Sequence, residues 1–146
     1  MSNWFEFDES ATVWGDADGN HRPSPWRVVA VPEVLTWFDA EERKRDQRFR
    51  ESLTDALLLL RREGPALRRP WVDQIKQSKL SHLKELRLKS SNGAAYRILF
   101  AFDPQRSAVL LVAGDKSPTW NAWYPRAIKL AENRYASYLR RRSQKS

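Results

Sequence analysis

Basic and phenolic side chains lie at or near the ends of apolar segments in the C-terminal half of the sequence. Arg97 lies within the apolar run 94–102, Lys116 follows the run 108–114, and Tyr124 comes eight residues later. Basic groups that converge on a phosphate stabilise the extra charge of a pentacoordinate transition state, and a phenol or a perturbed lysine moves protons. Such a set suffices for RNA cleavage by attack of the 2′-OH on its own phosphate, which needs no metal.

The sequence lacks the residue patterns of several other active sites. It has no cysteine and two histidines, His21 and His82, which excludes thiolate chemistry and a histidine-rich metal site. The glycine-loop phosphate motifs and the G-x-S-x-G elbow are missing. The carboxylates near the expected core strands are Glu85, Asp103 and Asp115, whereas a two-metal nuclease needs a cluster. We therefore expect no metal and no cofactor.

Arg97 itself has two interpretations. Strand alternation places it on the face of Leu99 and Ala101, within a very apolar segment. An arginine in such a strand costs free energy unless it has a partner or a function. It either binds a phosphate or forms a structural ion pair, for instance with Glu85 on the neighbouring strand.

The charge of the chain is unevenly distributed. The sequence has 26 basic and 18 acidic residues, a formal net charge of +8, and its first 25 residues are acidic. The basic remainder favours a polyanionic partner such as nucleic acid, although a basic surface kept for solubility fits the same count.

The length predicts one domain. We expect an acidic, mobile extension over residues 1–25, with a short strand at residues 4–7 and a loop over residues 15–25, where turn-forming residues are frequent. The domain then covers residues 26–142, and a tail covers 143–146. No apolar run approaches the roughly 20 residues that span a bilayer, and no signal peptide is evident, so we expect a cytoplasmic protein without a membrane partner.

The hydrophobic periodicity predicts strand, helices, three strands and a helix in that order. A strand at 26–31 precedes a short helix from Pro32, and a capping box at Asp39 and Glu42 precedes a longer helix that ends at Gly64. Strands are expected around 82–89, 94–103 and 107–114, and Ser117–Pro118 is expected to start the last helix. The fold class is therefore α+β: a small antiparallel-rich sheet packed by N-terminal helices and one C-terminal helix.

Three stretches between Gly64 and Leu139 carry a family resemblance. They are GPALRRPWVDQIKQSKLSHLKELRLKS, YRILFAFDP and AVLLVAGDKSPTWNAWYPRAIKLAENRY. The most distinctive marks are LKELR, then YRILF, then GDK with WNAWY. In this order and spacing they resemble the phage-derived Gp49-like, HigB-type toxins of the RelE/ParE superfamily.

The resemblance implies a sheet flanked by helices and a ribosome-dependent mRNA endonuclease. It also implies neutralisation by a cognate antitoxin, often one with a helix-turn-helix DNA-binding domain. By motif position it assigns phosphate binding to Arg97, the basic position after the last core strand to Lys116, and the base-stacking or proton-moving tyrosine to Tyr124.

Other positions complete the predicted site. Further RNA or phosphate contacts are expected from Lys79, Lys84, Arg87 and Arg126. Glu85 stands where some RelE-like relatives have a second basic residue, which leaves the identity of the general base open. Trp120 and Trp123 are expected to lie in the core.

Two other functions remain open from the sequence. The superfamily contains ParE-like toxins that inhibit DNA gyrase, and the fold does not separate them from the nucleases. A non-catalytic RNA-binding protein is the other alternative, and it would bind RNA with a steep salt dependence. The Y-R and G-D-K residues favour cleavage, because a pure binder does not need convergent phosphate ligands.

Overall fold

The computed structural model describes residues 4–8, 13–16 and 26–145 of the chain. Its seven-stranded sheet has the order β2-β1-β3-β7-β6-β5-β4. The strands are β1 (Phe5–Asp8), β2 (Val13–Asp16), β3 (Arg27–Ala30), β4 (Val72–Gln74), β5 (Lys84–Leu88), β6 (Tyr96–Phe102) and β7 (Ser107–Asp115). β3 runs parallel to β7, and all other neighbouring strands are antiparallel.

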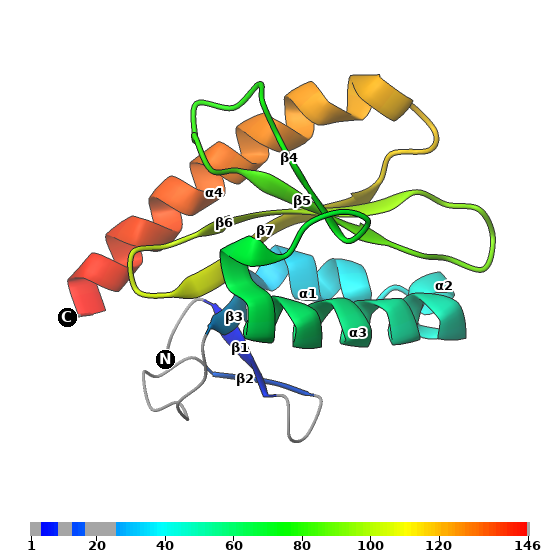
Figure 1. Ribbon diagram of the computed structural model, residues 1–146, viewed down its shortest axis with the longest axis horizontal. Coiled ribbons are helices and arrows are strands. Elements are labelled where there is room, and N and C mark those ends of the chain that lie inside the picture. The colour runs from blue at the N-terminus through cyan, green and yellow to red at the C-terminus, as the bar shows by residue number, and fades with distance from the viewer. Residues whose placement is uncertain (1–3, 9–12, 17–25, 146) are drawn as a thin grey trace.

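Helices cover both faces of the sheet. The N-terminal helices are α1 (Pro32–Phe38), α2 (Glu41–Lys44) and α3 (Gln47–Glu63), and α4 (Trp123–Lys145) closes the chain. Short 3-10 turns, η1 (Gly64–Ala66) and η2 (Trp120–Ala122), follow α3 and precede α4. Figure 1 shows α4 along one face and α1 to α3 along the other. The predicted α+β fold is confirmed.

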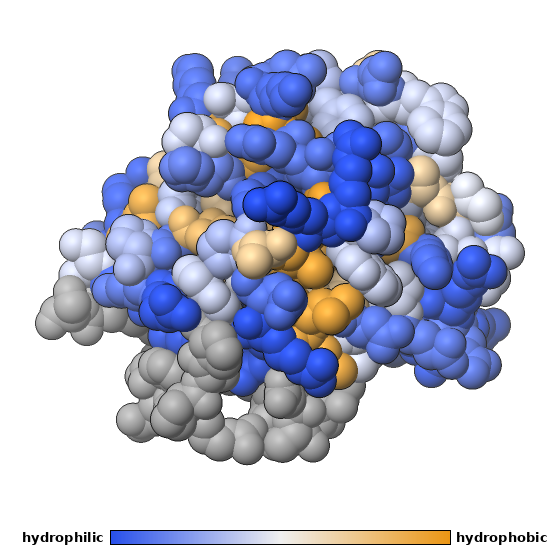
Figure 2. Space-filling model, viewed as in Figure 1, coloured by the Kyte–Doolittle hydropathy of each residue, from blue (hydrophilic) through white to orange (hydrophobic). Residues whose placement is uncertain are grey.

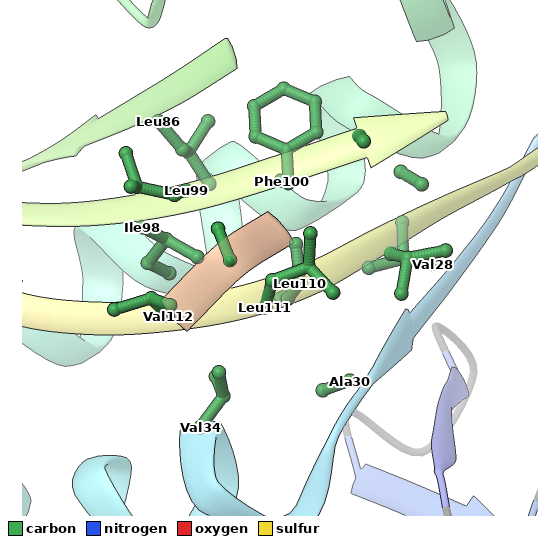
Figure 3. Packing of buried hydrophobic residues seen from close by; sticks show 14 of the residues in the cluster. Val28, Ala30, Val34, Leu86, Ile98, Leu99, Phe100, Leu110, Leu111 and Val112 are labelled. Atoms are coloured by element: carbon green, nitrogen blue, oxygen red, sulfur yellow. The ribbon is translucent and has the colours of Figure 1, made fainter. Parts of the chain in front are cut away.

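The core lies on strands β5, β6 and β7 and on the helix faces packed against them. Leu86, Ile98 and Leu110 are fully buried, and Figure 3 shows them together with Val34 of α1. Helix α3 packs on the sheet through the predicted apolar stripe. Its Phe49 is buried, and the centre of the Phe49 ring lies 5.2 Å from that of the Tyr96 ring. The same α3 face buries Leu57 and Leu60. This packing holds β5 and β6 in place from one side and leaves their other face to α4.

The long helix α3 ends at a glycine, as predicted. Gly64 has φ 54°, a left-handed conformation that side chains with a Cβ rarely adopt. The Trp26 indole fills the space where a Cβ would stand. A glycine is therefore required both by the backbone turn and by the ring against it.

Two predicted helix starts are wrong. The capping box at Asp39 and Glu42 does not form, because Asp39 ends α1, and the carboxylate of Asp46 caps α3 by accepting from the Phe49 N–H at 3.0 Å. Ser117 does not cap the last helix. Its N–H and hydroxyl both bind the Asp115 carboxylate, which favours a turn, and α4 begins only at Trp123.

Part of the N-terminal region joins the sheet. β1 covers most of the strand predicted at residues 4–7 and pairs with β3, and Glu6 binds Arg27 at 2.9 Å. Trp4 and Phe7 are buried. The predicted loop over residues 15–25 starts inside β2, and its residues 17–25 lie outside the described part of the chain.

The surface drawn in Figure 2 is mostly hydrophilic, with apolar side chains visible only between polar ones. Within the described ranges, every helix is too short or too polar to cross a bilayer.

Candidate functional site

The candidate site is built on the sheet face that α4 covers. Arg87 of β5 lies opposite Arg97 of β6, which in turn lies opposite Gly114 of β7. A Cβ on Gly114 would stand 2.8 Å from Nε1 of Trp123, so glycine lets the indole lie directly on the strand. This close approach brings the first turn of α4 over the two arginines and positions Tyr124 beside them.

A chain of hydrogen bonds connects three elements at this point. Nζ of Lys116 donates to the Tyr124 hydroxyl at 3.0 Å, and this hydroxyl donates to Oε1 of Glu85 at 2.6 Å. Glu85 is only 4% exposed. The three predicted catalytic residues are brought together, because Nε of Arg97 lies 3.5 Å from the same Oε1 of Glu85. The ion pair that was one interpretation of Arg97 therefore exists within the cluster.

A second carboxylate extends the cluster toward the sheet edge. Arg87 pairs with Asp73 of β4 at 3.0 Å and reaches Glu85 at 3.5 Å, and Arg69 pairs with Asp73 at 2.8 Å. Three arginines thus share two carboxylates, and Lys116 lies beside them on the Tyr124 hydroxyl, which leaves the cluster positive. The buried Nε atoms of Arg87 and Arg97 have no hydrogen-bond acceptor among the described residues. The net positive charge of the cluster favours the binding of an anion.

Burial and neighbouring charges shift the proton affinities in the cluster. Burial, together with the hydrogen bond to Glu85, raises the pKa of Tyr124 to about 12. Burial and the nearby Arg97 guanidinium lower the pKa of Lys116 from its ordinary value. At neutral pH Tyr124 is therefore a phenol that donates a proton, and Lys116 gives its proton up more readily than an exposed lysine.

These shifts predict opposite effects of two variants on Lys116. Glu85→Gln removes a charge that raises the Lys116 pKa, so we expect that pKa to fall further. Arg97→Ala removes a charge that lowers it, so the pKa should move back toward its ordinary value. Titration of the Lys116 side chain by NMR measures both. Shifts of the same sign in the two variants would contradict this arrangement of charges.

The cluster borders a groove of about 780 Å³ between α4 and the chain that joins β4 to β5. Glu132 of α4 holds this chain by accepting from the Ser78 hydroxyl at 2.9 Å and the Lys79 N–H at 2.7 Å. Glu85 and Tyr124 line the groove from the cluster side. The remaining lining residues are Gln74, Ile75, Lys76, Gln77, Lys79, Asn121, Pro125, Ile128, Lys129 and Glu132.

The predicted phosphate-binding residues separate into two groups. Arg87 lies in the cluster and Lys79 on the rim of the groove. Lys84 points to the opposite sheet face, where its Nζ donates to the Pro65 carbonyl at 3.3 Å, because alternate strand residues face opposite sides. Arg126 is exposed, and two residues beyond Tyr124 it is turned about 200° around the helix, away from the cluster.

Sequence reasoning missed part of the site and misplaced one aromatic. Arg69 and Asp73 were not predicted, since β4 has three residues and no alternating pattern to reveal it. Trp120 is 59% exposed, so the prediction that it lies in the core is wrong, whereas Trp123 packs against the core as expected. In the described part of the chain, no three histidine or carboxylate side chains are grouped as metal ligands.

An antiparallel-rich sheet between N-terminal helices and one C-terminal helix, with cations and a tyrosine gathered on one face, defines an α+β protein consistent with the RelE-like fold. The family model described as "Phage derived protein Gp49-like (DUF891)" matches residues 39–136, and the chain belongs to this family. The resemblance inferred from the LKELR, YRILF and GDK motifs is thereby confirmed.

Two curated relatives come from Mycobacterium tuberculosis (strain ATCC 25618 / H37Rv). "Putative toxin HigB3" is 43% identical over 112 residues, which cover 77% of this chain and 92% of that relative. "Putative toxin HigB2" is 38% identical over 109 residues, which cover 75% of this chain and 52% of that relative, so the chain spans about half of its length. No solved structure matches the chain.

Proposed function

We propose that the chain is the toxin of a type II toxin–antitoxin pair and that it cuts mRNA on the ribosome without a metal. The observation that carries the proposal is the hydrogen-bond chain from Lys116 through Tyr124 to Glu85, with Arg97 beside it. Proton-transfer groups and cations are thus combined at one place, as phosphoryl transfer requires. The two relatives named as toxins support the toxin assignment.

In the proposed reaction, Glu85 accepts the proton of the ribose 2′-OH, and the 2′-oxygen attacks the adjacent phosphorus. Arg87 and Arg97 bind the non-bridging oxygens and stabilise the charge of the pentacoordinate transition state. Tyr124, kept protonated by its raised pKa, gives its proton to the departing 5′-oxygen and recovers one from Lys116. The bond from phosphorus to the 5′-oxygen breaks, which yields a 2′,3′-cyclic phosphate and a 5′-hydroxyl end.

The proposed partners follow from the charge of the site. Message on the ribosome supplies the phosphate, and the cognate antitoxin, carrying a helix-turn-helix DNA-binding domain, covers the same positive face with an acidic or amphipathic segment. The protein would act in the cytoplasm, with residues 26–142 as the toxin domain and residues 1–25 as its extension.

The function is tested by producing the chain in cells without an antitoxin and mapping new mRNA 5′ ends across the genome. We expect cuts inside translated codons, with 5′-hydroxyl ends, and none with an Arg97→Ala/Lys116→Ala double variant. Growth arrest with intact messages would overturn the nuclease proposal and favour a gyrase inhibitor, which supercoiling assays detect. Binding of RNA without new ends would favour a non-catalytic RNA-binding protein.

A further inference from the structure

Trp120 is an exposed aromatic side chain beside the candidate site. Its exposed fraction is 59%, against 39% and 36% for Leu130 and Leu139, the other large apolar side chains that are exposed in the described part of the chain. Its φ of 48° is left-handed, a conformation that costs a bulky residue free energy. The fold thus holds a large apolar ring in solvent, at a backbone position that favours glycine.

The ring lies beside Lys116 of the catalytic cluster, next to a residue that lines the groove. Nζ of Lys116 lies 5.8 Å from the centre of the Trp120 ring and 3.0 Å from the Tyr124 hydroxyl. The next residue, Asn121, lines the groove. The turn that carries the tryptophan is held by the Thr119 N–H, which donates to the Lys116 carbonyl at 3.1 Å.

The residues that line the neighbouring groove indicate which kind of ligand would contact this ring. Lys76, Lys79 and Lys129 line the groove, whose apolar lining includes Ile75 and Ile128. Cations that follow a phosphate backbone, combined with an aromatic face for a base, are the features by which proteins bind single-stranded nucleic acid. An acidic peptide would satisfy the lysines, but it would not use the aromatic face.

We propose that Trp120 is a stacking platform for one nucleobase of the message, adjacent to the phosphate held by Arg87 and Arg97. The inference rests on the proposed nuclease function and adds to it a binding residue outside the proton-transfer chain. The stack fixes the strand on the Lys116 side, so that the scissile phosphate lies against the cluster while the neighbouring nucleotides follow the groove.

The test compares kcat and KM for cleavage of a short message on programmed ribosomes. Trp120→Ala is expected to raise KM about tenfold or more with a smaller effect on kcat, because loss of one base stack weakens binding by about that factor. Trp120→Phe keeps an aromatic face and should retain most of the affinity. Leu139→Ala, an exposed apolar change on α4 and 19 residues further along the chain, is the matched control and should resemble the wild type.

A series of messages, each with one abasic nucleotide near the cut, identifies the stacked base. At one position the missing base should raise KM for the wild type and have little further effect on Trp120→Ala, the non-additivity expected of a direct contact. A Trp120→Ala protein that cuts with wild-type KM overturns the inference and leaves the nuclease proposal standing. If Trp120→Ala cut with wild-type KM but was no longer neutralised by the antitoxin, Trp120 would instead belong to the antitoxin-binding surface. A wild-type chain that cuts no message overturns both proposals.

Discussion

Arg97→Ala is expected to slow single-turnover cleavage of ribosome-bound message by about 10²–10³-fold, the usual effect of removing one transition-state charge partner. Arg97 is mostly buried on the central strand β6, and its Nε has no hydrogen-bond acceptor within the described residues. One terminal N–H of its guanidinium donates to the Tyr96 carbonyl at 2.9 Å, which holds the positive charge beside Glu85, where the phosphate is proposed to bind. A loss of this size corresponds to about 2.7–4 kcal/mol of transition-state stabilisation.

The fold should survive this change, which makes the result interpretable. Without Arg97, Glu85 still accepts from Tyr124 and remains near Arg87, so its carboxylate keeps partners. Thermal unfolding should confirm a folded variant. Arg45→Ala is the control, since Arg45 is 83% exposed and directly follows α2, which lies on the other side of the sheet from α4. Cleavage by Arg97→Ala at the wild-type rate would contradict the assignment of this residue.

Local sequence patterns predicted the elements that position the site. β6 and β7 are rich in buried apolar residues, and the buried stripe of α3 follows helical spacing, so each element carried its own signal. The two wrong helix starts arose where capping residues had a competing use, as in the binding of Ser117 to Asp115. Side-chain oxygens of this kind form turns as readily as caps, and only tertiary context decides.

The composition of the site was partly predictable for a similar reason. Arg97 lies within a clearly apolar strand and Lys116 directly after another, and both were placed together with Tyr124. Asp73 enters through the pairing of β4 with β5, which joins residues without a local pattern. Trp120 is exposed at a left-handed backbone position just before α4, and no spacing in the sequence reveals this conformation. Local periodicity therefore fixes which face a residue occupies, whereas long-range pairing decides what it meets there.

Glu85→Gln is the second large expected effect and tests the general base directly. Glutamine has nearly the shape of glutamate and still accepts the Tyr124 hydroxyl, so the hydrogen-bond chain from Lys116 is preserved. It has little basicity and no charge. We expect kcat to fall by about 10²–10⁴-fold, the usual contribution of a positioned base.

The affinity for message distinguishes a general base at Glu85 from a residue with a purely structural role. Removing a negative charge from a positive cluster should leave the affinity for message unchanged or tighter, so the loss should appear in kcat alone. Asp73→Asn gives the comparison, because Asp73 holds Arg87 but does not contact Tyr124, and its effect on kcat should be much smaller. Asp55→Asn on the exposed side of α3 should have none. If Glu85→Gln kept its rate, Glu85 would only orient the arginines, and the 2′-OH proton would have to go to another group.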